Sequence, residues 1–189
     1  MESVAGLFRN YRDAEQAVLA LQEAGFDPEN ISLLARNNAI EENLPGETTV
    51  GDVAEGAGVG AATGGFAGGL LGVLAGLGAI VIPGIGPAVA AGSLAATLGL
   101  LTGGASLGAA VGGILGAMTK LSVPEEEAQV YIEGVRRGYL LVIAQAETDR
   151  LAKARAILEN AHAEDIDALR RSWKEAGWSA VDDGSSRPA

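Results

Sequence analysis

The sequence contains no cysteine and a single histidine, and only 4% of its residues are aromatic. Without cysteine the chain has neither a disulfide nor a thiolate nucleophile, and one histidine cannot complete a zinc site of cysteines and histidines. Basic residues are also scarce, 13 against 24 acidic ones, for a net charge of −11. No stripe of lysine and arginine exists, which argues against a nucleic-acid partner because phosphates require clustered positive charge.

Charge is missing altogether from one long segment. No charged residue lies between Glu55 and Lys120, so residues 56–119 are 64 consecutive uncharged residues. This segment holds 20 of the 28 glycines together with 15 alanines, whereas the rest of the chain carries every charge. The whole-chain averages therefore conceal two unlike parts.

The charged part begins with a predicted strand, helix and strand in residues 1–36. Val4 to Phe8 form a short apolar run, and Asn10 with Asp13 resembles a capping box at a helix start. Gly25 is the expected left-handed residue at the end of this helix. Its predicted buried face repeats at helical spacing and consists of Ala14, Ala17, Val18 and Leu21.

The same arrangement returns in residues 120–170, after one extra helix. Ser122 is the expected N-cap of that helix, and Glu125, Glu126 and Glu127 complement its dipole. Residues 139–144 predict a strand, a helix follows, and Ile166 and Leu169 mark a weaker last strand. His162 stands after the second helix where Gly25 stands after the first, so we interpret it as a helix cap.

Residues 3–34 and 138–169 thus each predict strand, helix, strand. Two such units predict an α+β fold, a ferredoxin-like α/β sandwich with its helices on one face of the sheet. We expect residues 37–55 to be an acidic linker. Residues 171–189 are expected to form a partly disordered tail, in which Trp173 and Trp178 suit an interfacial anchor or a partner contact.

The uncharged segment is predicted to interrupt this sandwich as a long glycine-rich, hydrophobic α-helical hairpin. Its turn lies at residues 83–87, where Pro83, Gly84, Gly86 and Pro87 cannot continue a helix. The arms are residues 56–82 and 88–119. Small residues recur in both arms at steps of four, and the glycines expected to pack helices are Gly56, Gly60, Gly64, Gly68, Gly72, Gly76, Gly92, Gly104, Gly108, Gly112 and Gly116.

Such glycine spacing predicts close contact between helix backbones. In water each interior glycine costs about 1 kcal/mol relative to alanine, so a helix with six of them needs compensation. Small residues at every fourth position let helices touch in lipid. The leading interpretation is therefore transmembrane helices in the cytoplasmic membrane, and the alternative is a soluble ring or shell whose hairpins bury one another.

Several motifs resemble those of bacterial general stress and low-temperature-induced proteins over roughly residues 3–170. The most specific is Pro83-Gly84-Ile85-Gly86-Pro87 followed by Ala90-Ala91-Gly92. Further matching pieces are Val4-Ala5-Gly6-Leu7-Phe8, Asp13-Ala14-Glu15, Ala24-Gly25-Phe26, Pro124-Glu125-Glu126-Glu127-Ala128, Tyr131, Gly134, Arg137-Gly138 and Leu141-Val142. The resemblance implies a role in stress response, a glycine-zipper region and no catalytic residue.

The chain offers no catalytic, cofactor-binding or metal-binding motif of its own. No nucleophile elbow is present, and no Gly-x-Gly string follows a strand in a βαβ unit. Arg136 and Arg137 with Tyr131 suit either an anionic headgroup or, more simply, a solvated helix end. We therefore expect a non-enzymatic protein without a small-molecule substrate, which binds itself and a lipid membrane.

The expected location follows from the N-terminus, which lacks the basic start, apolar run and cleavage site of a secretory signal. We expect the α/β part in the cytoplasm, with the hairpin in the cytoplasmic membrane. The alternative is a soluble cytoplasmic assembly.

Overall fold

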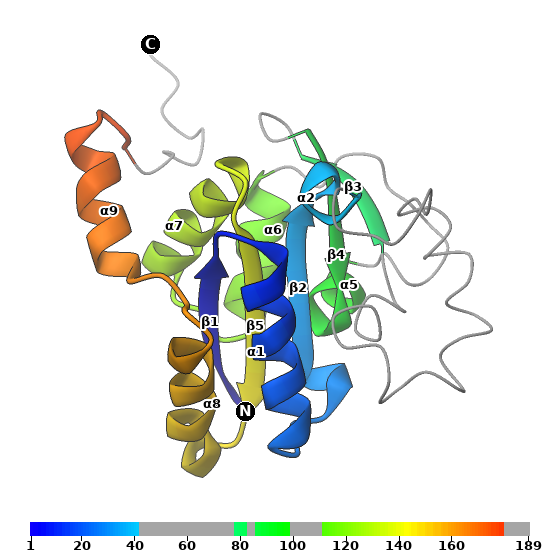
Figure 1. Ribbon diagram of the computed structural model, residues 1–189. Coiled ribbons are helices and arrows are strands. Elements are labelled where there is room, and N and C mark those ends of the chain that lie inside the picture. The colour runs from blue at the N-terminus through cyan, green and yellow to red at the C-terminus, as the bar shows by residue number, and fades with distance from the viewer. Residues whose placement is uncertain (42–77, 83–85, 99–110, 180–189) are drawn as a thin grey trace.

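The computed structural model describes residues 1–41, 78–82, 86–98 and 111–179, which build a mixed α+β fold on one five-stranded sheet (Figure 1). The strand order is β1-β5-β2-β4-β3, and all neighbouring strands run antiparallel. The strands are β1 (Glu2–Phe8), β2 (Ile31–Arg36), β3 (Gly78–Ile82), β4 (Gly86–Ala91) and β5 (Leu140–Ala146). The predicted α+β class is therefore confirmed.

The first strand–helix–strand unit forms as its sequence predicts. Helix α1 (Tyr11–Glu23) joins β1 to β2 through the short 3-10 helix η1 (Pro28–Asn30). The Asn10 side chain accepts a hydrogen bond from the Asp13 amide at 2.9 Å, and Gly25 has φ +81°. Strand β5 lies between β1 and β2 and is antiparallel to both, so this is a split βαβ unit.

The centre of the uncharged segment differs from the prediction. Strands β3 and β4 pair with Ile82 opposite Gly86, so the chain reverses between two strands and the expected helical hairpin is wrong at this point. Ala88 to Ala91 are all buried within the sheet. A strand covered on both faces has a continuous apolar sequence, and periodicity alone does not distinguish it from a buried helix.

The predicted single layer of helices is also wrong, because helices cover both faces of the sheet (Figure 1). Helices α1 and α8 (Thr148–Asn160) bury one face in a core that includes Phe8, Leu21 and Val142. Helices α5 (Gly92–Thr97), α6 (Val111–Lys120) and α7 (Glu125–Arg136) cover the other face, around Leu94, Met118 and Ile143. The uncharged segment supplies α5 and α6, so part of it is core of the fold.

The C-terminal part contains a further correction. The expected last strand is a helix, α9 (Ile166–Glu175), because the Asp165 side chain accepts hydrogen bonds from the Asp167 and Ala168 amides and starts it. Trp173 is buried, so the expected tail begins within this helix. Ser122 does not cap α7: it has φ +63° and terminates α6.

Residues 37–41 of the expected linker form helix α2 (Asn37–Glu41). Within the described ranges, no helix combines the length and apolar character that a membrane crossing requires.

Candidate functional site

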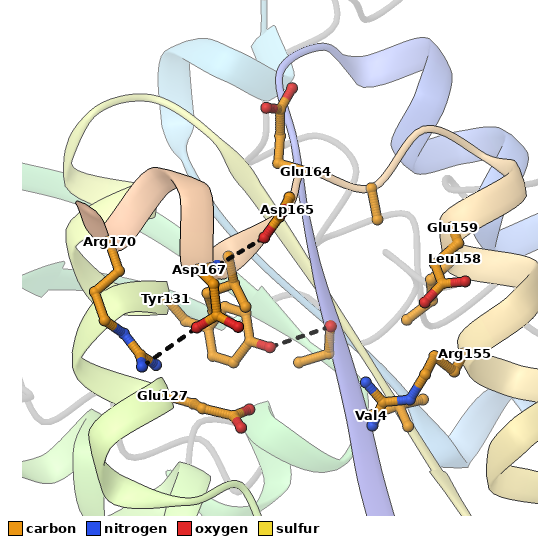
Figure 2. A pocket seen from close by; sticks show the side chains of 13 residues that line it. Val4, Glu127, Tyr131, Arg155, Leu158, Glu159, Glu164, Asp165, Asp167 and Arg170 are labelled. Atoms are coloured by element: carbon orange, nitrogen blue, oxygen red, sulfur yellow. Dashed lines mark hydrogen bonds and ion pairs between the residues drawn. The ribbon is translucent and has the colours of Figure 1, made fainter. Parts of the chain in front are cut away.

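A groove lies along the outer edge of β1, the strand that ends the sheet on one side (Figure 2). In an antiparallel sheet, alternate residues of an edge strand direct their peptide groups away from the neighbouring strand. In β1 these residues include Ala5 and Leu7, since their carbonyl oxygens accept hydrogen bonds from outside the sheet. The groove therefore presents main-chain groups as well as side chains.

One partner of this edge comes from the connection between α8 and α9. The Glu164 amide donates to the Leu7 carbonyl at 2.9 Å, a normal length for the hydrogen bonds that join paired strands. The chain then enters α9 because Asp165 caps that helix. The groove therefore lies along β1 beside the segment for which the sequence predicted a last strand.

Three helices form the walls. The groove has a volume of about 520 Å³, within the range of ligand-binding pockets. Helix α7 contributes Glu127 and Tyr131, α8 contributes Arg155 and Glu159, and α9 contributes Arg170. Figure 2 shows Arg155 beside Val4 on one side of β1 and Glu127 with Tyr131 on the other.

Tyr131 is the most enclosed polar group of the groove, with 4% of its surface exposed. Its hydroxyl donates to the Ala5 carbonyl at 3.2 Å, which is long for a hydroxyl donor. Burial, together with the charge of Glu127, raises its pKa well above the ordinary value. The phenol therefore remains a neutral donor at physiological pH.

The groove is rich in carboxylates, with five of them against two guanidinium groups. Asp167 pairs with Arg170 at 3.4 Å, and Glu164 pairs with Arg9 at 2.5 Å. Among the described residues neither Glu127 nor Glu159 forms an ion pair, so negative charge dominates the groove. An incoming cationic group would be attracted.

The chemistry of this arrangement is that of binding. It combines main-chain acceptors, a buried hydroxyl donor and carboxylates. Among the residues that the structure describes, no group of three or more histidines, aspartates or glutamates is placed to hold a metal ion.

Only some of the glycines predicted to pack helices lie in the described residues. Gly56, Gly60, Gly64, Gly68, Gly72, Gly76, Gly104 and Gly108 lie outside the described residues. Gly92 has φ +71° and packs against β2, where an added Cβ would overlap the Ile31 carbonyl. Gly112 and Gly116 are in α6, and a Cβ at Gly116 would meet no described atom within 4 Å.

The predicted turn residues are divided in the same way. Pro83 and Gly84 lie outside the described residues, whereas Gly86 and Pro87 begin β4. Proline is tolerated there because Pro87 is near the start of β4 and precedes the residues that pair with β2, which begin at Ala88.

The arginines near Tyr131 in the sequence do not share its surroundings. Arg137 donates to the buried Glu133 carboxylate at 2.7 Å and stacks over Trp173 at 4.8 Å from the ring centre. Arg136 also contacts Glu133, at 3.3 Å. These side chains lie at the C-terminal end of α7.

Sequence reasoning missed the groove. Its residues run from Val4 to Arg170, and no local motif connects them. The one available signal was Tyr131 with Glu127 four positions earlier on α7, which places both on one helix face.

The fold and the groove define a mixed α+β protein with an antiparallel sheet and a polar groove at its edge strand. Residues 3–82 match a family model described as heat induced stress protein YflT domain. This match supports a bacterial general stress protein family, the group that the sequence motifs resemble. The matched range contains β1, α1 and β2, whereas α7, α8 and α9 lie beyond it.

Comparison with curated proteins found no match, and comparison with solved structures found none.

Proposed function

We propose that this is a non-enzymatic stress-associated protein that acts by self-assembly through its uncharged glycine-rich segment. The stress association rests on the family match at residues 3–82. The observation that favours self-assembly is the run of glycines at every fourth position from Gly56 to Gly76, in a stretch without charge. Small residues at this spacing suit close contacts between helices.

The way in which this segment joins the fold favours self-assembly over a spanning hairpin. Residues 42–77 begin after α2, next to β2, and lead into β3, which belongs to the same sheet. Two crossings of a bilayer need about 40 apolar residues, since one crossing takes about 20. Residues 42–77 are too few to supply two crossings.

Shallow membrane association is the second candidate. It is favoured by the 22 uncharged residues 56–77, whose apolar side chains include Phe66, Leu70 and Leu71. Under both candidates the α+β body lies in the cytoplasm.

A ferredoxin-like arrangement of the sheet, with α9 in place of one strand, fits its split βαβ unit.

The test is purification without detergent, followed by light scattering and by flotation with lipid vesicles. We expect a defined homo-oligomer that does not float. Replacing Gly64, Gly68 and Gly72 with leucine should dissociate it, because bulk at the contact prevents close approach. The matched control places leucine at Ala62, Ala67 and Ala75 instead. These residues lie off the four-residue step, so the control should leave the oligomer intact.

A monomer that floats with vesicles would instead support the membrane candidate. An oligomer of unchanged size in the glycine variant would refute the proposed contact.

A further inference from the structure

Helices wall in the outer edge of β1. Ala5 lines a groove flanked by α8 on one side and by α7 and α9 on the other (Figures 1 and 2). The Leu7 carbonyl, on the same edge, accepts the Glu164 amide. A strand edge of this kind is a template for another extended chain. Glu164 already uses it through a single amide, which shows that the edge accepts backbone donors.

We propose that this groove binds an extended peptide segment with basic side chains, which adds to the sheet beside β1. Backbone hydrogen bonds to the edge would give affinity. Lysine or arginine side chains of the peptide would lie near Glu127 and Glu159, on opposite walls of the groove. This site is independent of the glycine-rich segment and of the self-assembly proposed above.

Because helices wall the groove, its shape favours a single extended peptide over a second copy of the same edge. Pairing two β1 edges would bring α8 and α9 of one copy against the same helices of the other, which also carry acidic groups such as Glu159 and Asp167. Like charges would then face one another. A single extended segment with positive charge avoids both the steric and the electrostatic conflict.

Tyr131 acts as a competitor for this edge. Its hydroxyl takes the Ala5 carbonyl, the next acceptor along β1 after Leu7, through a long hydrogen bond of 3.2 Å. An incoming peptide amide would have to displace it. Tyr131→Phe keeps the packed ring and frees the acceptor, so it should tighten peptide binding several-fold.

The probe is a labelled, end-capped pentapeptide, Val-Lys-Lys-Val-Val, whose adjacent lysines point to opposite faces of an added strand. It is titrated into the full-length protein and followed by fluorescence anisotropy. Hydrogen exchange measured on the same mixture should slow in residues 2–8, where free edge amides become bonded. The first control carries N-methyl groups on the amides that face β1, and the second has glutamate in place of lysine. Each control should bind at least tenfold more weakly.

Two variants of the protein separate the groove from general attraction to an acidic surface. Glu127→Gln with Glu159→Gln should weaken binding of the lysine peptide about three- to tenfold. The matched control, Glu23→Gln with Glu29→Gln, removes the same charge from residues outside the groove lining and should leave it unchanged.

Three results would overturn the proposal. Equal binding of the N-methylated peptide would mean that charge alone attracts it. Unchanged exchange in residues 2–8 would place the peptide elsewhere. Protection of β1 that increases with protein concentration, without peptide, would identify a second copy as the occupant.

Discussion

At the scale of single residues, two residues other than glycine have a left-handed backbone conformation, which glycine normally adopts. His162 has φ +66° and Ser122 has φ +63°, and each lies just beyond a helix end. Gly25, Gly138 and Gly177 hold the equivalent places after α1, α7 and α9. The left-handed conformation costs a residue with a Cβ about 1–2 kcal/mol, so strain remains at the two non-glycine positions.

His162→Gly should therefore raise the free energy of unfolding by about 0.5–1 kcal/mol, the relieved strain less the greater entropy of an unfolded glycine. Urea unfolding at pH 7 measures the change. Gly138→Ala is the opposite substitution at an equivalent place where an added Cβ meets no described atom within 4 Å, and it should lower stability by about 1 kcal/mol. A loss of stability in His162→Gly would show that the 3.9 Å contact with Asp13 matters more than the strain.

A second residue-scale feature is the buried hydroxyl of Ser32. It accepts a hydrogen bond from the Leu94 amide at 3.0 Å and contacts the Ser93 hydroxyl at 2.8 Å. Helix α5 has no side-chain cap from its own Ala91, so a residue of β2 satisfies this early amide.

Ser32→Ala should consequently destabilise the protein by about 1–3 kcal/mol, because it leaves a buried amide without an acceptor. The comparison is Ser93→Ala, which removes only the hydroxyl contact and should cost less. Equal losses in denaturant unfolding would contradict the capping role.

At the scale of elements, five helices end in the same motif. After α1, α6, α7, α8 and α9, two successive amides turn back to bond carbonyls of the last helical turn. The second of these residues is apolar or aromatic in each case: Phe26, Val123, Tyr139, Ala163 and Trp178. After α9 the motif explains the pair of tryptophans, since the Trp178 amide donates to the Trp173 carbonyl at 2.8 Å and their ring centres are 6.2 Å apart.

Trp178 also packs against the core cluster that contains α7 residues and Trp173, so it should hold α9 in place against α7. Trp178→Ala is expected to cost about 1–3 kcal/mol, less than a fully buried tryptophan because Trp178 is only partly buried. Hydrogen exchange in residues 166–175 should speed up more than exchange in β5. Trp178→Phe keeps an aromatic ring and should restore most of the protection, whereas uniform acceleration in both regions would point to global loss instead.

At the scale of the whole molecule, both cores bury a tyrosine. Tyr11 belongs to the core under α1, where burial and then Glu15 raise its pKa to about 12, and Tyr131 belongs to the opposite core with a pKa raised by burial. A raised tyrosine pKa means that the folded state binds the proton more tightly than the unfolded state. The stability that each protonated tyrosine contributes is fully present below pH 10, the pKa of the unfolded state. It is lost as the pH rises from there through the pKa of the folded state.

Alkaline unfolding should accordingly begin above pH 10 and steepen towards pH 12. Tyr11→Phe and Tyr131→Phe should each flatten this decline, because a phenyl ring cannot ionise. Urea midpoints measured from pH 8 to pH 12 supply the data, and a decline of the same slope in the double variant would assign alkaline loss to other groups.

The sequence by itself determined the local elements of this protein. The first unit, α7, β5, α8 and the caps at Asn10 and Gly25 follow from signals within a few residues, because caps and helical periodicity act over one or two turns. The interpretation of His162 as a helix cap is consistent with its left-handed conformation. The match at residues 3–82 supports the stress-protein resemblance drawn from these same motifs.

Only the tertiary structure decided where those elements go. Residues 86–91 form a strand because β2 has an edge that they pair with, and residues 78–82 then pair with β4. Sheet pairing of this kind depends on partners far away in sequence. Residues 166–169 are helical because Asp165 caps α9 and Leu169 and Trp173 find a core against α7. The groove lies beside β1 because residues 166–175 form α9 instead of the expected strand. It is built from segments that are distant in the sequence.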